Sequence, residues 1–138
     1  MASPADAIAN LLPNTIVDGV TGWLLRIGKL PDTPNQVVVF YDSGGSNPNP
    51  KWRVDYSTIQ VRIRGIKSDY SGAYDKAREI RDHLLGIDSQ ALGSDWLVSL
   101  TVMGDIGFTG YDDNDRPEFT INFRTIIEPA SGANRESL

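Results

Sequence analysis

One glycine- and proline-rich segment, residues 44–51, invites comparison with a phosphate-binding loop. Such a loop needs the spacing G-x-x-x-x-G-K-[ST], in which backbone N–H groups surround the phosphate oxygens. Here the two glycines are adjacent, and Pro48 and Pro50 remove amide donors from the segment. We therefore interpret residues 44–51 as a surface loop, the usual place for such a composition.

A second segment, residues 112–115 (Asp-Asp-Asn-Asp), resembles part of a calcium-binding loop. An EF-hand loop places oxygen ligands at alternate positions, followed by a fixed glycine and a final glutamate. Arg116 and Pro117 occupy positions that this pattern needs. Because Asp and Asn are common turn residues, the segment predicts a hairpin turn and no metal site.

Residues for catalysis are hard to find. His83 is the only histidine, and its surroundings predict an exposed position on a helix. A catalytic base needs a positioned nucleophile, and the sequence has no G-x-S-x-G motif. It also has no cysteine, which excludes disulfides, a thiol nucleophile and Cys-ligated zinc. We therefore expect no enzyme, no catalytic residue, no cofactor and no bound metal.

Arg62 and Arg64 lie on the polar side of a predicted strand, where two interpretations carry equal weight. The first is a solvated sheet face. The second is a subunit interface, because a planar guanidinium binds a carboxylate through two hydrogen bonds and the acidic chain offers many carboxylates.

The formal net charge of −5 disfavours tight binding of nucleic acid, whose phosphates select basic surfaces. No apolar run approaches the roughly 18 residues of a membrane-spanning helix. The first residues lack the basic and apolar regions of a secretory signal. These features predict a soluble protein that is made inside the cell and has no membrane partner.

Two segments have helical periodicity. The first follows the capping residue Ser3 and ends at Pro13, with an apolar stripe of Ile8, Leu11 and Leu12. The second covers residues 70–85, and either Asp69 or Ser71 could cap it. Its apolar stripe predicts the side chains that pack on the body of the protein: Ala73, Ala77, Ile80 and Leu84.

Strand patterns lie on both sides of the longer helix. Residues 23–27, 36–41 and 58–64 precede it, and the apolar run at 36–41 predicts a strand covered on both faces. After the helix come strands at 96–103 and 119–127, with a brief strand near Ile106 and Phe108. Alternation places Trp96, Val98, Leu100 and Val102 on one face, and a phase change at residues 125–127 predicts a bulge there.

This order of elements predicts an α+β fold with one long helix packed on the sheet and a short N-terminal helix. Short polar connections favour a mostly antiparallel sheet, with a mixed sheet as the alternative. We expect one domain over residues 1–128 and a flexible C-terminal tail at 129–138.

Four of these segments, taken in order, resemble the tail terminator proteins (tail completion or minor capsid proteins) of long-tailed bacteriophages. They are the strand and loop Val37–Pro50, the strand Ser57–Gly65, the helix Tyr74–Leu85 and the late segment Asp115–Phe123. The last is the most specific, because the family often carries Arg-Pro, an aromatic residue and then Asn-Phe. Asp115 stands where a glycine is common in the family, which weakens the match at the turn.

The resemblance implies a structural protein of the virion, made in the host cytoplasm. Such proteins form a ring, typically a hexamer, on the head-proximal end of the tail tube. The ring ends tube polymerisation and offers a surface to the head-completion or connector protein, with DNA only passing through its bore. The alternatives are a tail tube or head–tail connector subunit and, from another class, a small enzyme or ligand-binding domain whose site is assembled in space.

Assembly contacts are expected in the loops 43–52 and 104–116, because both are long and rich in groups that can order on docking. Arg62 and Arg64 are further candidates for pairs between subunits. The candidate interface residues are Asp42, Ser43, Trp52, Arg62, Arg64, Asp105, Phe108, Asp112, Asp115 and Arg116.

Overall fold

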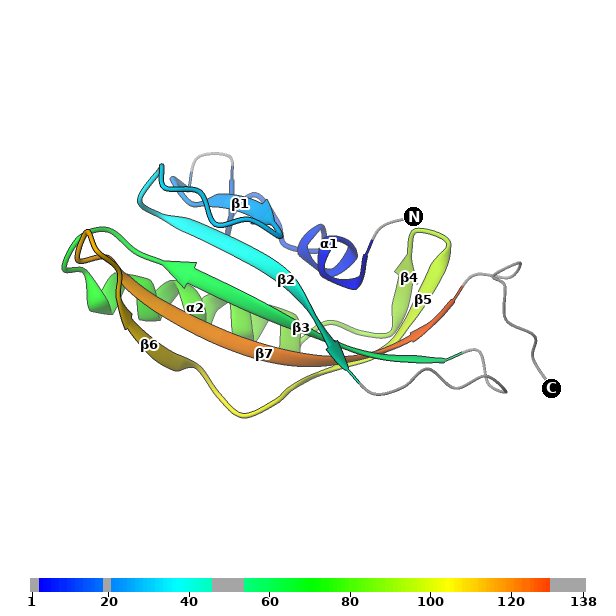
Figure 1. The fold of residues 1–138 in the computed structure, drawn as a ribbon. Helices are drawn as coiled ribbons and strands as arrows, with labels where there is room; N and C mark the ends of the chain where they lie inside the picture. Colours follow the sequence, from blue (N-terminus) through cyan, green and yellow to red (C-terminus); the bar gives the residue numbers. More distant parts are fainter. Residues whose placement is uncertain (1–2, 19–20, 46–53, 130–138) are drawn as a thin grey trace.

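A curled, mixed sheet of seven strands carries both helices on one face (Figure 1). The computed structural model describes residues 3–18, 21–45 and 54–129, and all but the first residue of the tail expected at 129–138 lies outside these ranges. The strand order is β1-β2-β3-β7-β5-β4, and β6 pairs with β7. The α+β prediction is confirmed.

The elements are α1 (Pro4–Ala9), β1 (Leu24–Ile27), β2 (Val37–Gly45), β3 (Asp55–Arg64), α2 (Tyr70–Leu85), β4 (Gln90–Leu92), β5 (Asp95–Val102), β6 (Gly107–Tyr111) and β7 (Pro117–Glu128).

The antiparallel pair β3–β7 forms the centre of the sheet. Its register places three apolar pairs opposite one another on the face that meets the helices, because side chains alternate between faces along a strand. All six side chains are buried: Ile59 with Phe123, Val61 with Ile121, and Ile63 with Phe119.

Helix α2 has the bounds and the buried stripe that its periodicity predicts. Ala73, Ala77, Ile80 and Leu84 are fully buried against the sheet. Asp69 is the N-cap, since its carboxylate accepts a hydrogen bond of 3.0 Å from the Gly72 N–H.

Strand β2 is covered on both faces at residues 37–40, as expected. However, the strand continues to Gly45, where a loop was expected from Ser43. Its pairing with β3 shifts between Asp42 and Gly45, and this irregularity lets the chain stay paired despite two glycines. Gly45 has φ +122°, and a Cβ there would collide with the backbone oxygen of Tyr56.

The sheet is mixed because β1 runs parallel to β2. A parallel pair usually needs a crossover of a dozen or more residues. Here nine residues, 28–36, connect the strands, which is sufficient because β1 has only four residues. The connection must turn back along β1, and so it lies at the end of the sheet where β2 begins.

The predicted faces of β5 are wrong in its first half. Leu97 and Leu100 are buried, whereas Trp96 and Val98 are exposed. The pairing of β5 with β7 shifts between Leu97 and Ser99, and the extra residue reverses the alternation.

The bulge predicted at residues 125–127 is also wrong. Strand β7 keeps its alternation through this stretch, and the irregularity lies in its partner β5. Thr125 occupies a core position and is fully buried. Its hydroxyl donates a hydrogen bond of 3.0 Å to the Ser57 carbonyl, which makes a polar residue acceptable there.

Two further differences lie next to α1. The helix ends at Ala9, and tight turns that bring Leu11 and Leu12 back to Ile8 and Ala9 continue the chain toward Pro13. The short strand β4 was not predicted, because three residues carry too little periodicity. Neither helix in the described ranges is long and apolar enough to cross a membrane.

The buried stripe of α2 predicts a large difference between two substitutions. Ile80→Asp places an unpaired carboxylate among apolar side chains and should cost about 3 kcal/mol or more. This corresponds to a decrease in Tm of about 10 °C, measured by circular dichroism. The control Asp82→Ser, on the exposed side of the helix, should change Tm by less than about 2 °C. Equal Tm values for the two variants would contradict the packing described here.

Candidate assembly interface

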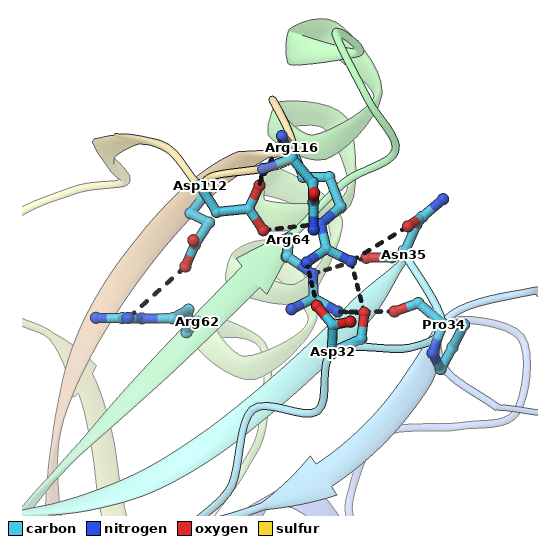
Figure 2. Close-up of polar contacts among 9 residues, drawn as sticks. Asp32, Pro34, Asn35, Arg62, Arg64, Asp112 and Arg116 are labelled. Atoms are coloured by element: carbon cyan, nitrogen blue, oxygen red, sulfur yellow. Dashed lines mark hydrogen bonds and ion pairs between the residues drawn. The ribbon is translucent and has the colours of Figure 1, made fainter.

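Arg116 lies buried at the end of the sheet where β2 begins and β6 meets β7, with 5% of its side chain exposed. Its Nε donates to Asp112 Oδ2 over 2.7 Å, and its Nη2 donates to Asp32 Oδ1 over 3.0 Å (Figure 2). Its Nη1 donates to the Asp32 carbonyl and to Asn35 Oδ1. One guanidinium therefore joins the β6–β7 hairpin to the connection between β1 and β2.

Arg64, at the end of β3, is also buried and holds the same connection (Figure 2). Its Nε donates to the Asn35 carbonyl over 3.0 Å, and its Nη2 donates to the carbonyls of Pro34 (2.7 Å) and Asp32 (3.3 Å). Arg64 is neither exposed to solvent nor accessible to another subunit, because residues 32–35 of the same chain cover it. We call Arg64, Arg116, Asp112 and residues 32–35 the arginine knot.

The turn at residues 112–116 explains how Arg116 is held in place. Asp112 Oδ1 accepts hydrogen bonds of 2.9 Å from the backbone N–H groups of Asn114 and Arg116. The Asp112 N–H bonds to the Arg116 carbonyl, and Asp115 adopts a positive φ of 58°. The predicted hairpin turn is thus confirmed. No group of three or more metal-ligating side chains occurs among the described residues.

The charges in the knot shift its pKa values in opposite directions. Burial raises the pKa of Asp112, but the hydrogen bonds from Arg116 and Asn114 outweigh this effect and lower it overall. Burial lowers the pKa of Arg116, but its bonds to Asp112 and Asp32 raise it. The pKa of Arg64 is lowered by burial and by the neighbouring charge of Arg116. Both guanidinium groups remain charged at neutral pH because arginine starts from so high a pKa.

Arg62 lies next to the knot on the face of the sheet opposite the helices. Its Nη1 is 3.6 Å from Glu118 Oε1, and about a third of the side chain is exposed. Its Nε is buried and has no hydrogen-bond partner. Beside it, burial raises the pKa of the Tyr41 hydroxyl, while the positive charge of Arg62 opposes that shift. Arg62 is thus less completely bound than Arg64 and Arg116.

Three aromatic side chains form an exposed patch beside the knot. Phe108 on β6 makes ring contacts with Tyr70 at 5.0 Å and with Tyr111 at 5.4 Å between centroids. Phe108 is 43% exposed and Tyr111 is 51% exposed. The buried ring of Phe119 packs beneath Tyr70 and Phe108. The rings are therefore already fixed in position. We call Tyr70, Phe108 and Tyr111 the aromatic patch.

The structure does not bring all candidate interface residues together. Arg64, Asp112 and Arg116 meet in the knot, and Arg62, Phe108 and Asp115 lie near it. Asp42 caps α1 by accepting from the Ala5 N–H at 2.8 Å, and Ser43 is hydrogen-bonded to Thr58. Asp105 pairs with Arg81 at 2.8 Å. Trp52 lies outside the described residues.

Four residues of this region are not among the candidates predicted from the sequence: Asp32, Asn35, Tyr70 and Tyr111. The loop containing Asp32 and Asn35 has two prolines, and this composition indicates a loop without indicating its partners. Tyr70 and Tyr111 lie outside the apolar stripes. The one signal that could have indicated them is their position, because Tyr70 is the first residue of α2 and Tyr111 is the last residue of β6.

A shallow hollow of about 400 Å³ lies between α1 and the β4–β5 hairpin. Ala7, Leu11 and Leu92 line it, together with backbone and small polar groups. Asp95 is its one titratable lining residue, and Asp95 has interactions of its own. This hollow thus lacks convergent titratable groups, whereas a second hollow of about 390 Å³ beside the knot is lined by Asp32, Lys67, Asp113, Asp115 and Arg116.

Removing Arg116 should destabilise the protein. Arg116→Ala leaves Asp112 and the carbonyl groups of loop 32–35 without their donor, and we expect a loss of about 2–3 kcal/mol in the free energy of unfolding. Lys67→Ala, an exposed change at the same end of the sheet, is the control and should leave stability unchanged within about 0.5 kcal/mol. Urea unfolding measures both variants, and equal midpoints would contradict a stabilising knot.

The lowered pKa of Asp112 predicts a pH dependence. A carboxylate with a lower pKa in the folded state stabilises the protein above its unfolded pKa of about 3.9. That contribution is lost as pH falls through the folded pKa. As the pH falls below about 4, wild-type protein should therefore lose stability more steeply than Asp112→Asn, and as steeply as the exposed control Asp113→Asn. Parallel acid-unfolding curves for wild type and Asp112→Asn would contradict this prediction.

The comparisons with known proteins agree with the resemblance found in the sequence. A family model described as bacteriophage tail terminator protein matches residues 11–129. No curated protein matches the chain. The matched range begins after α1 and covers every strand, helix α2 and the whole arginine knot. The chain therefore belongs to the bacteriophage tail terminator family, whose members are structural components of the virion.

Proposed function

We propose that this protein forms a closed ring, with a hexamer as the expected size, on the head-proximal end of a phage tail tube. The ring ends tube polymerisation and presents its free side to the head-completion or connector protein. The observation that carries the proposal is the family match across residues 11–129.

The architecture supports this function in a specific way. A ring cap needs a rigid subunit with two different sides, because one side binds the tube and the other binds the head. The knot fixes the β1–β2 connection and the β6–β7 hairpin to β3, which makes one end of the subunit rigid. The opposite end carries the β4–β5 hairpin and α1 (Figure 1).

The charge of the chain is compatible with DNA that passes without being held. A net charge of −5 gives weak attraction to phosphate at physiological salt. DNA is therefore a passing molecule in this proposal. The protein partners are further copies of this chain, the tube protein and the head-completion protein.

Deletion of the gene tests the proposal through tail length. Without a cap, the growing end stays competent to add tube subunits. Phage lacking the protein should then make DNA-filled heads that do not join tails, together with tubes of abnormal and variable length. Electron microscopy measures the length distribution, and supplying the wild-type protein should restore uniform joined tails.

Other outcomes identify other functions. Tails of normal length that fail to attach indicate a head–tail connector, and absence of tubes indicates a tube or initiator subunit. Uniform, joined tails without the protein overturn the proposal. Deleting residues 104–116 is not a suitable variant, because it removes β6 and the Arg116 contacts that stabilise the fold.

A further inference from the structure

We propose that the free edge of β1 is a pairing surface for the β1 strand of a second copy of this chain, and that Asp18 and Arg26 keep this surface closed. The inference goes beyond the proposed ring, because it concerns a symmetric contact that the wild-type chain prevents. It is carried by the two hydrogen bonds that occupy the backbone of Leu25.

Strand β1 is the first strand in the order of the sheet, so one of its sides faces no other strand (Figure 1). The Leu24 N–H donates to the Gln36 carbonyl over 3.2 Å, so Leu24 directs its backbone groups toward the β2 side. Successive residues of a strand direct these groups to opposite sides. Leu25 and Ile27, together with Trp23 just before the strand, therefore direct theirs to the free side. Outward N–H and C=O groups of this kind are a template for another strand.

Both outward groups of Leu25 are bound by side chains of the same chain. The Leu25 N–H donates to Asp18 Oδ1 over 3.0 Å. The Leu25 carbonyl accepts a hydrogen bond of 2.9 Å from Arg26 Nη1. A second strand could bond to Leu25 only after it displaced both side chains.

The groups on either side of Leu25 leave little room for pairing. The Trp23 carbonyl accepts from the Asp18 N–H over 2.6 Å, and the Trp23 N–H donates to Thr21 Oγ1 over 3.1 Å. Gly28, with φ +76°, follows Ile27 directly, and β1 ends at Ile27. No described residue binds the outward groups of Ile27, but one open residue is too few for a strand to add.

The occupant that fits this edge is the same strand of a second copy. In an antiparallel pair of two β1 strands, Leu25 lies opposite Leu25 of the other copy, and the two residues exchange both of their backbone bonds. Trp23 of each copy then lies opposite Ile27 of the other. Such a contact uses the same surface on both copies and closes at two. The two groups at its centre are those that Asp18 and Arg26 occupy.

Charge opposes this pairing less strongly than the two hydrogen bonds do. In the antiparallel register the two Arg26 side chains lie diagonally across the pair, about 7–8 Å apart, and repel each other. Asp18 binds the same residue as Arg26 and offsets part of this repulsion. The block at Leu25 is therefore mainly the occupation of its N–H and C=O groups.

A single introduced cysteine measures the contact, because the wild-type chain has no cysteine and one cysteine per chain can join only two copies. In the antiparallel pair the two Ile27 positions are about 14 Å apart, at about 3.3 Å per residue along the strands and 4.8 Å between them. A bismaleimide with a hexane linker spans this distance. Ile27 is 39% exposed, so Ile27→Cys is accessible to the reagent.

The opened variant combines Asp18→Gly with Arg26→Ala. Glycine replaces Asp18 because residue 18 has a φ of 57°, which glycine adopts without strain. With Ile27→Cys, the opened variant should give at least about tenfold more cross-linked dimer than Ile27→Cys alone, because backbone bonds between copies become available. Each of the two changes alone should give an intermediate amount.

Three controls isolate the cause. Asp75→Ala/Arg78→Ala removes the same two charges from an exposed ion pair on α2 and should leave cross-linking at the wild-type level. Asp18→Asn loses the charge but keeps the acceptor oxygen, so the edge should stay closed. The opened variant with Tyr111→Cys in place of Ile27→Cys should give no additional dimer, because Tyr111 lies on β6.

Hydrogen exchange at Leu25 gives a second readout. At low protein concentration the Leu25 N–H of the opened variant should exchange at least about fivefold faster than in wild type, because its acceptor is gone. At high concentration the exchange should slow again as the second copy binds. A Tm close to that of wild type shows that the variant is folded.

The outcomes decide the inference without the phage. Equal cross-linking in the opened variant and in wild type, an equal increase in Asp75→Ala/Arg78→Ala, or an open edge in Asp18→Asn overturns it. Unchanged Leu25 exchange in the opened variant also overturns it. The effect of gene deletion on tail length is independent of these results, so the proposed function can fail while the inference stands, and the reverse.

Discussion

The structure depends on the buried guanidinium of Arg116. Taking this charge out of water is costly, and the cost is offset only because its nitrogens meet Asp112, Asp32 and Asn35 at hydrogen-bond distances. The loop at residues 32–35 contains Pro34 and cannot complete a regular ladder, so the two arginines bind its carbonyl oxygens. The same bonds place the β1–β2 connection against the β6–β7 hairpin. The knot therefore fixes the connection after β1 and the turn before β7 relative to each other.

Much of the fold could be predicted because burial is one-sided in its main elements. The stripe of α2 and the alternation of β3 and β7 report directly on the core, since each buried residue recurs with the period of its element. Strand β5 could not be predicted in the same way. One extra residue near Val98 reverses its faces, and a bulge leaves no mark in composition. At Thr125 the sequence suggested a bulge where the strand is regular. A threonine can occupy this core position because its hydroxyl donates a hydrogen bond to the Ser57 carbonyl.

The candidate site was only partly predictable, because its contacts are distant in sequence. Asp112 and Arg116 are four residues apart in a turn, so their relation could be read locally. Asp32 is 84 positions from Arg116, and only the fold brings them together. Arg64 looked like a surface residue because its strand alternates regularly. The loop that covers it precedes β2 in the chain and gives no signal of where it lies.

A ring cap has to reconcile two requirements, a strong contact between copies and no further growth. Continuous strand pairing between free edges would meet the first and violate the second, because each added copy presents the same open edge. In this chain Asp18 and the bulge in β6 restrict strand pairing at the β1 and β6 edges. The exposed side chains at these edges are the aromatic patch on β6 and Arg26, Ile27 and Lys29 on and after β1. Edges that resist strand addition are compatible with the closed ring that we propose, because growth by open-ended strand pairing is then restricted.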